Sequence, residues 1–335
     1  MKPNWKALKR QPAVFALILL VLAIIVNFIL QPNLFAKDTL NSNMRVFLPI
    51  ILLSAGQAVV ILGGGIDISV GGIVSIVNTI LATRVGLEGS PEAMWQYVAL
   101  SLLVGVLAGA INGFFVAYLR LQPIITTYAT SFLYAGFALF ILPNPGGGIP
   151  AKIAELYRST SPLGLPLAFY VIAIVLGLWL YIRSTRYGNF LFAVGGKPQA
   201  AYETAVPVTL VQFSTYVISG LMAAFAGIAI TMLSGSGNAD IGSAMTLNSI
   251  TAVVIGGTAM SGGVGGVAGP VMGAITLGLI QNIISFAHIN TWWETLVKAT
   301  IIVVALAMPG VINLFRTASR RSNGTASRRS FGRRE

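Results

Sequence analysis

The residues best placed to do chemistry lie in a short polar break between two apolar stretches. The segment GGGIDISVGG, at 63–72, places Asp67 and Ser69 where a helix would restart. An acidic residue at membrane depth is a candidate ligand for a polar substrate or an ion. The same side chains could instead cap exposed backbone N–H groups, which are costly when left unpaired in lipid. The capping interpretation is favoured, and the break itself is expected to shape a translocation path.

A second glycine-rich break, GGTAMSGGVGGVAGP at 256–270, contains no charged residue. Its glycines either line a narrow passage or only allow two helices to cross closely, and the sequence leaves both open. Asparagines inside apolar stretches suit neutral, hydroxyl-rich substrates, although they also join helices by hydrogen bonds. The candidate residues of the path are Asp67, Ser69, Asn112, Asn248, Gly256 and Gly257. Broken or re-entrant helices are expected near 63–69 and 256–266.

Several kinds of chemistry are excluded by residues that the chain lacks. It has no cysteine and a single histidine, His288, so thiolate sites and histidine clusters are excluded. Gly195-Gly196-Lys197 is followed by Pro198 and lacks the spacing and hydroxyl of a phosphate-binding loop. The chain is therefore not expected to be an enzyme, to bind a cofactor or metal, or to hydrolyse ATP itself.

Asp67 is the one acidic residue expected within the membrane interior. The remaining acids fall in loops, at span ends or in the tail: Asp38, Glu88, Glu92, Glu155, Glu203, Asp240, Glu294 and Glu335. Carriers driven by protons or sodium usually need ionisable groups in the membrane interior. The energy for any transport is thus expected to come from another protein.

The elements that must position these residues are apolar helices. Of 335 residues 56% are apolar and 9% charged, against roughly 25% charged in soluble domains. The composition predicts an all-α, polytopic transmembrane bundle of about ten spans, with eight to ten possible because some segments are broken. The expected spans are 13–30, 46–63, 68–84, 98–118, 124–142, 167–182, 213–233, 247–262, 266–286 and 295–312.

Charge predicts the domain organisation and the orientation. A basic N-terminus at 1–12 precedes a transmembrane domain at 13–312, and a basic tail at 313–335 is expected to be disordered. With both termini in the cytoplasm, fifteen cations lie inside and five outside, as the positive-inside rule requires. The first apolar run resembles a signal peptide but is long enough to be a retained span. RNA or anionic-lipid binding by the tail is the alternative, and no nucleic-acid partner is expected.

The polar loop at 183–212 is predicted to face the cytoplasm. It carries Gly195-Gly196 and then a short helical stretch at 198–204, with apolar spans on both sides. A membrane protein that does not hydrolyse ATP itself needs a surface on which an energy-supplying partner can bind. This loop is the best candidate for that surface.

A short internal repeat links the two breaks. AVVI at 58–61 and VGG at 70–72 recur with the same spacing as AVVI at 252–255 and VGG at 264–266. Transporters are often built from two repeats with broken helices near the midplane. A chance match in glycine- and valine-rich sequence is the alternative.

Three motifs resemble the membrane permeases of ribose-type ABC importers, a family that includes permeases for ribose, xylose, galactose, galactofuranose and autoinducer-2. They are GGIDISVGG at 64–72, RYGNFLFAVGGKPQAA at 186–201 and ITAVVIGGTAMSGGVGGVAGPVMGAI at 250–275. The resemblance covers roughly residues 10–315 in the same order. It implies a multi-pass protein of the cell inner membrane, and it does not specify the substrate.

The resemblance also implies partners: a second permease, identical or related, a pair of cytoplasmic ABC ATPase subunits that bind ATP and Mg, and a periplasmic or lipid-anchored sugar-binding protein. In this family a coupling helix docks on the ATPase. By position its residues here are Gly195, Gly196, Lys197, Pro198, Gln199, Ala200, Ala201 and Glu203. The family often has Ser-Gly-Ile after this helix, whereas this chain has Thr204-Ala205-Val206, which leaves the exit turn open.

Two other functions remain open from the sequence. One is a related importer for branched-chain amino acids or nucleosides, which shares much of this pattern. The other is a carrier or channel that works without ATP. Loss of transport on loss of the ATPase, rather than on depolarisation, would separate the ATP-driven importer from the carrier.

Overall fold

The computed structural model describes residues 12–288 together with 293, 296, 299, 300 and 303. These residues are built into helices without β-strands, and one isolated β-bridge joins Gly146 to Gly237. The chain divides into two compact units, Met1–Ala287 and His288–Glu335, and helices α2 to α13 all lie in the first. The predicted all-α class is confirmed for the described residues.

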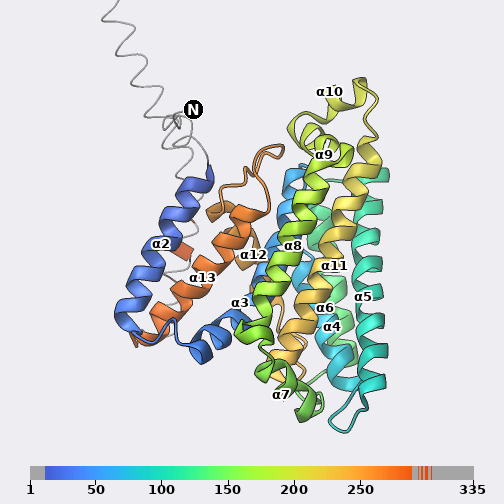
Figure 1. Cartoon of the computed structure of the whole chain (residues 1–335). Coiled ribbons are helices and arrows are strands. Elements are labelled where there is room, and N and C mark those ends of the chain that lie inside the picture. Colours follow the sequence, from blue (N-terminus) through green and yellow to red (C-terminus); the bar gives the residue numbers. More distant parts are fainter. Residues whose placement is uncertain (1–11, 289–292, 294–295, 297–298, 301–302, 304–335) are drawn as a thin grey trace, which may run out of the picture. The chain divides into compact units, whose positions relative to one another are not determined.

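The helices follow one another with short connections (Figure 1). The first are α2 (Pro12–Leu30), α3 (Lys37–Leu62), α4 (Val70–Arg84), α5 (Pro91–Gly113) with its π-helical end η1 (Phe114–Tyr118), and α6 (Pro123–Ile141). Next come α7 (Ala151–Ser159), the 3-10 turn η2 (Pro162–Gly164), α8 (Leu167–Ser184), α9 (Arg186–Gly196) and α10 (Pro198–Glu203). The last are α11 (Val208–Ser234), α12 (Ser243–Ile255) and α13 (Ala268–Phe286).

Local sequence sets several of these helix ends. Proline occupies the first turn of α5, α6 and α10, where its missing N–H costs no intrahelical bond. Before α5, the Ser90 hydroxyl accepts a hydrogen bond from the Ala93 N–H at 3.2 Å. Helix α11 ends at Gly235, whose φ of 71° is the left-handed conformation that glycine adopts readily.

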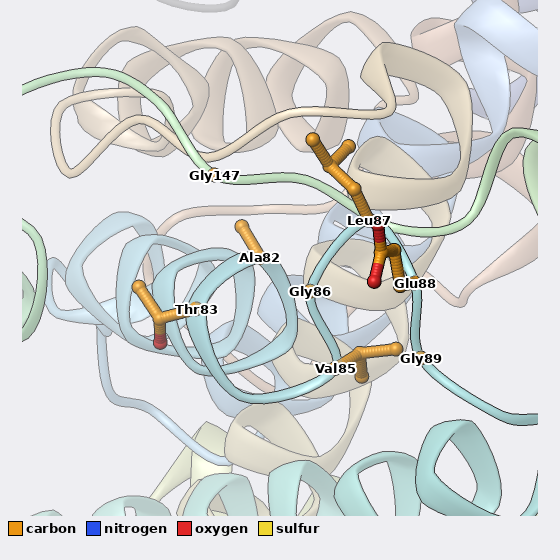
Figure 2. A pocket seen from close by; sticks show the side chains of 8 residues that line it. All are labelled: Ala82, Thr83, Val85, Gly86, Leu87, Glu88, Gly89 and Gly147. Atoms are coloured by element: carbon orange, nitrogen blue, oxygen red, sulfur yellow. The ribbon is translucent and has the colours of Figure 1, made fainter.

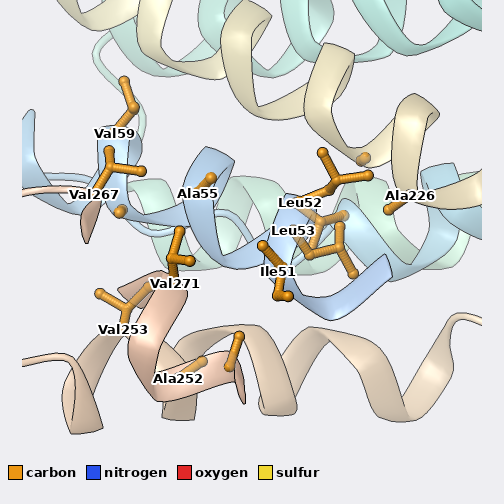
Figure 3. Packing of buried hydrophobic residues seen from close by; sticks show 14 of the residues in the cluster. Ile51, Leu52, Leu53, Ala55, Val59, Ala226, Ala252, Val253, Val267 and Val271 are labelled. Atoms are coloured by element: carbon orange, nitrogen blue, oxygen red, sulfur yellow. The ribbon is translucent and has the colours of Figure 1, made fainter. Parts of the chain in front are cut away.

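Helix α3 lies in the interior of the bundle. It packs against α8, α11, α12 and α13, and most of its residues beyond Phe47 are buried. Figure 3 shows Ile51, Leu52 and Leu53 of α3 among side chains from α11, α12 and α13. Helices α5, α6 and α8 instead present many large apolar side chains at the surface, as helices facing lipid do.

Small residues bring α5 and α11 into close contact. A side chain at Gly105 would collide with the backbone of Gly220, and one at Gly109 with the carbonyl of Tyr216. Such positions allow two helices to approach until their backbones touch, which is the usual way that helices associate in membranes.

The expected number of about ten spans is not confirmed. Among the described residues, α3, α5 with η1, α6, α8, α11 and α13 are the six helices long and apolar enough to cross a membrane. Two further apolar helices, α4 and α12, are shorter, and α2 contains an apolar stretch at Ala16–Leu30. Hydropathy marked α4 and α12 as spans because it detects apolar character and not helix length. The expected span at 295–312 and the tail at 313–335 lie largely or wholly outside the described residues, as do residues 1–11 of the basic N-terminus.

Candidate functional site

Asp67 lies in the break between α3 and α4 and is completely buried. Its Oδ1 accepts hydrogen bonds from the Ser69 N–H at 3.0 Å and the Ser69 hydroxyl at 2.7 Å. Its Oδ2 accepts one from the Ser219 hydroxyl of α11 at 2.9 Å. The side chain therefore receives donors both from the turn that starts α4 and from a helix distant in sequence.

The hydrogen bonds extend from Ser69 to α5 and α6, and from the Asp67 backbone to α3. Asn112 of α5 donates to the Ser69 hydroxyl at 2.7 Å and accepts from Thr130 of α6 at 2.7 Å. Gln57 of α3 faces the backbone of Asp67, and in the amide orientation that satisfies both groups the distances are 3.0 and 3.2 Å. We call Gln57, Asp67, Ser69, Asn112, Thr130 and Ser219 the polar cluster.

The geometry of the polar cluster is suited to holding helices together. All its side chains are buried, and their donors and acceptors are directed at one another. Buried polar groups that are fully paired fix the relative positions of the elements that carry them. In this conformation the cluster holds four helices around the first break.

The second break, between α12 and α13, is closed mainly by its own backbone. The Thr258 hydroxyl donates to the Gly266 carbonyl at 2.9 Å, and the Ala259 N–H donates to the Val264 carbonyl at 3.0 Å. Gly256 lies against the backbone of Gly269, with no room for a side chain. At Gly256 the glycine therefore serves the close crossing of two helices.

The structure brings together only some of the expected path residues. Asp67, Ser69 and Asn112 belong to the polar cluster. Gly256 and Gly257 lie in the second break, and Gly257 has a φ of 77° that favours glycine. Asn248 is half-buried on α12, and within the described part of the chain it forms no hydrogen bond to the polar cluster.

The polar segment at 183–212 is mostly helical. Thr185 starts α9 by accepting a hydrogen bond from the Gly188 N–H at 3.4 Å. Lys197 then turns the chain with an extended backbone, and α10 begins at Pro198. The expected short helix at 198–204 is confirmed by α10, whereas a separate α9 was not predicted. Figure 1 shows α9 and α10 together at one end of α8 and α11.

Helix α10 offers an exposed polar face and one inward residue. Exposed residues of α10 and the residues leading into it are Gly196, Lys197, Pro198, Gln199, Ala200, Tyr202 and Glu203. Gly195 and Ala201 are buried. Ala201 packs into this chain's own core, and its neighbour Ala200 is exposed.

The exit turn after α10 contains a strained residue. Ala205 has a φ of 59°, in the region where a side chain is disfavoured and glycine is not. The Val206 N–H nevertheless donates to the Ala201 carbonyl at 3.1 Å, and Val206 is buried. The turn that the sequence left open is thus the one expected of glycine, formed here with alanine.

The opposite end of the bundle carries α7 and the turn between α4 and α5 (Figure 1). Arg158 of α7 donates to the Leu233 carbonyl near the end of α11 at 2.7 Å. Burial raises the pKa of Tyr157 to about 12, so its hydroxyl stays neutral at physiological pH. The segments 31–45 and 143–166, which lie between expected spans, are partly helical, because α3 begins at Lys37 and α7 occupies Ala151–Ser159.

An open hollow of about 610 Å³ lies at this same end. Figure 2 shows it between the end of α4, the turn that follows, and the segment carrying Gly147. Its lining residues are Ala82, Thr83, Val85, Gly86, Leu87, Glu88, Gly89 and Gly147. With a single charged side chain, Glu88, this hollow has little chemistry to recognise a ligand.

Sequence reasoning missed Ser219, Thr130 and Tyr202. Ser219 stands four residues before Ala223 and eight before Gly227, a spacing of small residues that marks a helix contact. That signal could have identified the α11 face, although not its bond to Asp67. Thr130 gave no signal in the sequence. Tyr202 could have been noticed as an aromatic residue inside a polar segment.

Comparison with known proteins identifies the family. The family model described as "Branched-chain amino acid transport system / permease component" matches residues 39–306. The ribose import permease protein RbsC of Escherichia coli (strain K12) is 30% identical over 296 residues, covering 87% of this chain and 91% of that protein.

Two further relatives span nearly the whole chain. The autoinducer 2 import system permease protein LsrD of Photorhabdus temperata is 30% identical, covering 87% of this chain and 89% of that protein. The galactose/methyl galactoside import permease protein MglC of Escherichia coli (strain K12) is 29% identical, covering 92% and 96%. No solved structure matches the chain. The chain belongs to the family of permease components of branched-chain amino acid transport systems.

Proposed function

We propose that the chain is the membrane-spanning permease subunit of an ATP-driven, binding-protein-dependent sugar importer. The family membership supports a permease, and the names of the similar proteins, which import ribose, galactose or methyl galactoside, support a sugar or a similar hydroxyl-rich substrate. ATP and Mg would be bound by a partner ATPase. A second permease, identical or related, would complete the path, and the protein would lie in the inner membrane with both termini in the cytoplasm.

The observation that carries this proposal is the exposed face of α10. This six-residue helix projects from the bundle with Gln199, Ala200 and Glu203 exposed, and so offers a compact surface for a partner to bind. Tyr202 adds a side chain that is 70% exposed, and tyrosines are enriched at the energetic centres of interfaces. Docking of the ATPase on this face would let ATP binding act on the spans. The α7 end would receive the sugar-binding protein.

Within this function the polar cluster holds the first break in place, and Asp67 acts through position rather than as a ligand in this conformation. Gly256 and Gly257 shape the second break, while half-buried Asn248 remains a candidate for contact with the substrate. Burial and hydrogen bonding support those assignments.

A second candidate substrate class is favoured by the family description itself, which names branched-chain amino acids. Uptake of labelled ribose and galactose, compared with labelled leucine, into cells with and without this chain separates the two classes. Uptake of a sugar that depends on the chain supports the proposal, and uptake of leucine alone contradicts it.

Copurification tests the ATPase partner. The tagged chain, extracted in mild detergent from its native membrane, is expected to bring down a protein with Walker motifs, identified by mass spectrometry. Glu203→Lys reverses a charge on the α10 face and should lower ATPase recovery by roughly tenfold. Glu155→Lys, which changes another exposed acid, on α7, is the matched control and should leave recovery unchanged. Equal recovery from both variants would place the docking surface elsewhere.

A further inference from the structure

Three glycine-rich segments that are far apart in the sequence meet beside the end of α9. A side chain at Gly195 would collide with the Leu62 carbonyl, and its Cβ would lie 2.7 Å from the backbone nitrogen of Gly263. A Cβ at Gly262 would lie 3.0 Å from the Cα of Gly64 and 3.1 Å from the carbonyl carbon of Gly195. We call Gly64, Gly195, Gly262 and Gly263 the glycine junction.

The glycine junction joins both breaks directly. The Gly263 N–H of the second break donates to the Leu62 carbonyl, at the end of α3, at 3.1 Å. Gly64, Gly262 and Gly263 have φ values of 83°, 81° and 68°. Residues other than glycine rarely adopt such values, because their side chains disfavour this conformation. The approach is therefore built into the backbone, without intervening side chains.

The junction also touches the segment that leads to α10. A Cβ at Gly263 would lie 2.6 Å from both the nitrogen and the Cα of Gly196. Only Lys197 separates Gly196 from the first residue of α10, Pro198. Close-packed elements in direct contact shift together or separate, because they cannot be compressed.

We infer that the glycine junction transmits movement from α10 to the second break, with the first break as its fixed support, and that Gly195 is the positioning residue on which this transmission depends. The inference rests on the proposed function, in which an ATPase moves α10. The polar cluster bonds the first break to four helices, whereas the second break has mainly internal bonds. The second break is therefore the part expected to follow α10.

Label distances test whether α10 and the second break move as one. Because the chain has no cysteine, spin labels can be placed at Thr204→Cys, directly after α10, and at Val264→Cys in the second break, both exposed. A third label at Leu87→Cys, exposed at the opposite end of the bundle, gives the reference. Distances are measured in the complex with its ATPase, without nucleotide and with ATP trapped by vanadate.

We expect the 204–264 distance to stay constant between the two states while the 204–87 distance changes. A change in the 204–264 distance larger than the width of its distribution would mean that α10 moves independently, which overturns the inference. A constant 204–87 distance would overturn it too, because no movement would then pass through α10.

A matched pair of glycine substitutions tests the role of Gly195. Gly195→Ala introduces a methyl group into the junction, whereas Gly177→Ala on α8 places one in open space. Gly195→Ala is expected to keep its copurified ATPase but lower sugar uptake by roughly tenfold, while Gly177→Ala keeps both. Normal uptake by Gly195→Ala overturns the inference. If Gly195→Ala fails to accumulate, the label distances decide, since those variants leave the junction unchanged.

The outcomes separate the inference from the proposed function. A wild-type preparation without any ATPase counts against the proposed function. Normal uptake by Gly195→Ala in a complex that contains the ATPase counts against the junction alone.

Discussion

The two breaks satisfy the hydrogen bonds of their polar groups in different ways. The first, between α3 and α4, bonds its polar groups to side chains of α3, α5, α6 and α11 through the polar cluster. The second, between α12 and α13, satisfies its backbone largely within itself through Thr258. Anchoring to neighbours fixes a break in place, whereas internal closure lets it shift as a unit. The difference suggests that one break is a fixed point and the other a moving part.

The largest expected effect comes from Asp67→Ala. It leaves the buried hydroxyls of Ser69 and Ser219 without their acceptor, and each unsatisfied buried group costs about 1–3 kcal/mol. We expect a loss of thermal stability in detergent and of protein in the membrane, measured by fluorescence size-exclusion after heating. Asp67→Asn, which keeps an acceptor oxygen and the volume, should retain more of both. Wild-type stability of Asp67→Ala would show that the first break is not anchored by this side chain.

A smaller effect is expected from Gly269→Ala at the start of α13. Its methyl group would collide with the Gly256 carbonyl, and such overpacking costs roughly 1–3 kcal/mol. Gly136→Ala on α6 meets nothing within 4 Å and is the control. A lower midpoint of thermal aggregation for Gly269→Ala alone supports the tight crossing, and equal midpoints would contradict it.

The smallest effect is expected from Thr258→Val. Replacing the hydroxyl by a methyl group removes the hydrogen bond that it donates to the Gly266 carbonyl, worth about 1 kcal/mol, and the longer one that it accepts from the Gly266 N–H at 3.4 Å. The backbone of this break is partly exposed. The aggregation midpoint should fall less than for Asp67→Ala under the same conditions. A greater fall would reverse the comparison and make the second break the anchored one.

Most helices could be predicted from the sequence, because each lies in an apolar run that is too long for the surface of a soluble protein. It located both breaks from their glycine runs and α10 from Pro198. It placed the start of α3 too late, since the polar residues after Lys37 are helical but not apolar. Hydropathy indicates whether a segment favours an apolar or an aqueous environment, and it does not indicate whether its backbone is helical.

The candidate site was less predictable from the sequence. Asp67, Ser69 and Asn112 were selected individually, but their contact, and the participation of Ser219, depend on tertiary packing. The contact of Gly64, Gly195 and Gly262 likewise could not be predicted from the sequence, because a glycine does not specify which backbone segment will approach it.

The pairing of α2 with α13 has a consequence for synthesis. Asn27 of α2 donates to the Leu279 carbonyl at 3.0 Å, and α2 lies along α13 in Figure 1. Residues 31–267 separate these helices in the chain, and at about 5–20 residues per second their translation takes about 10–50 seconds. During that interval the ribosome has delivered the first helix but not its partner. Its early residence in the bilayer must depend on its own apolar side chains.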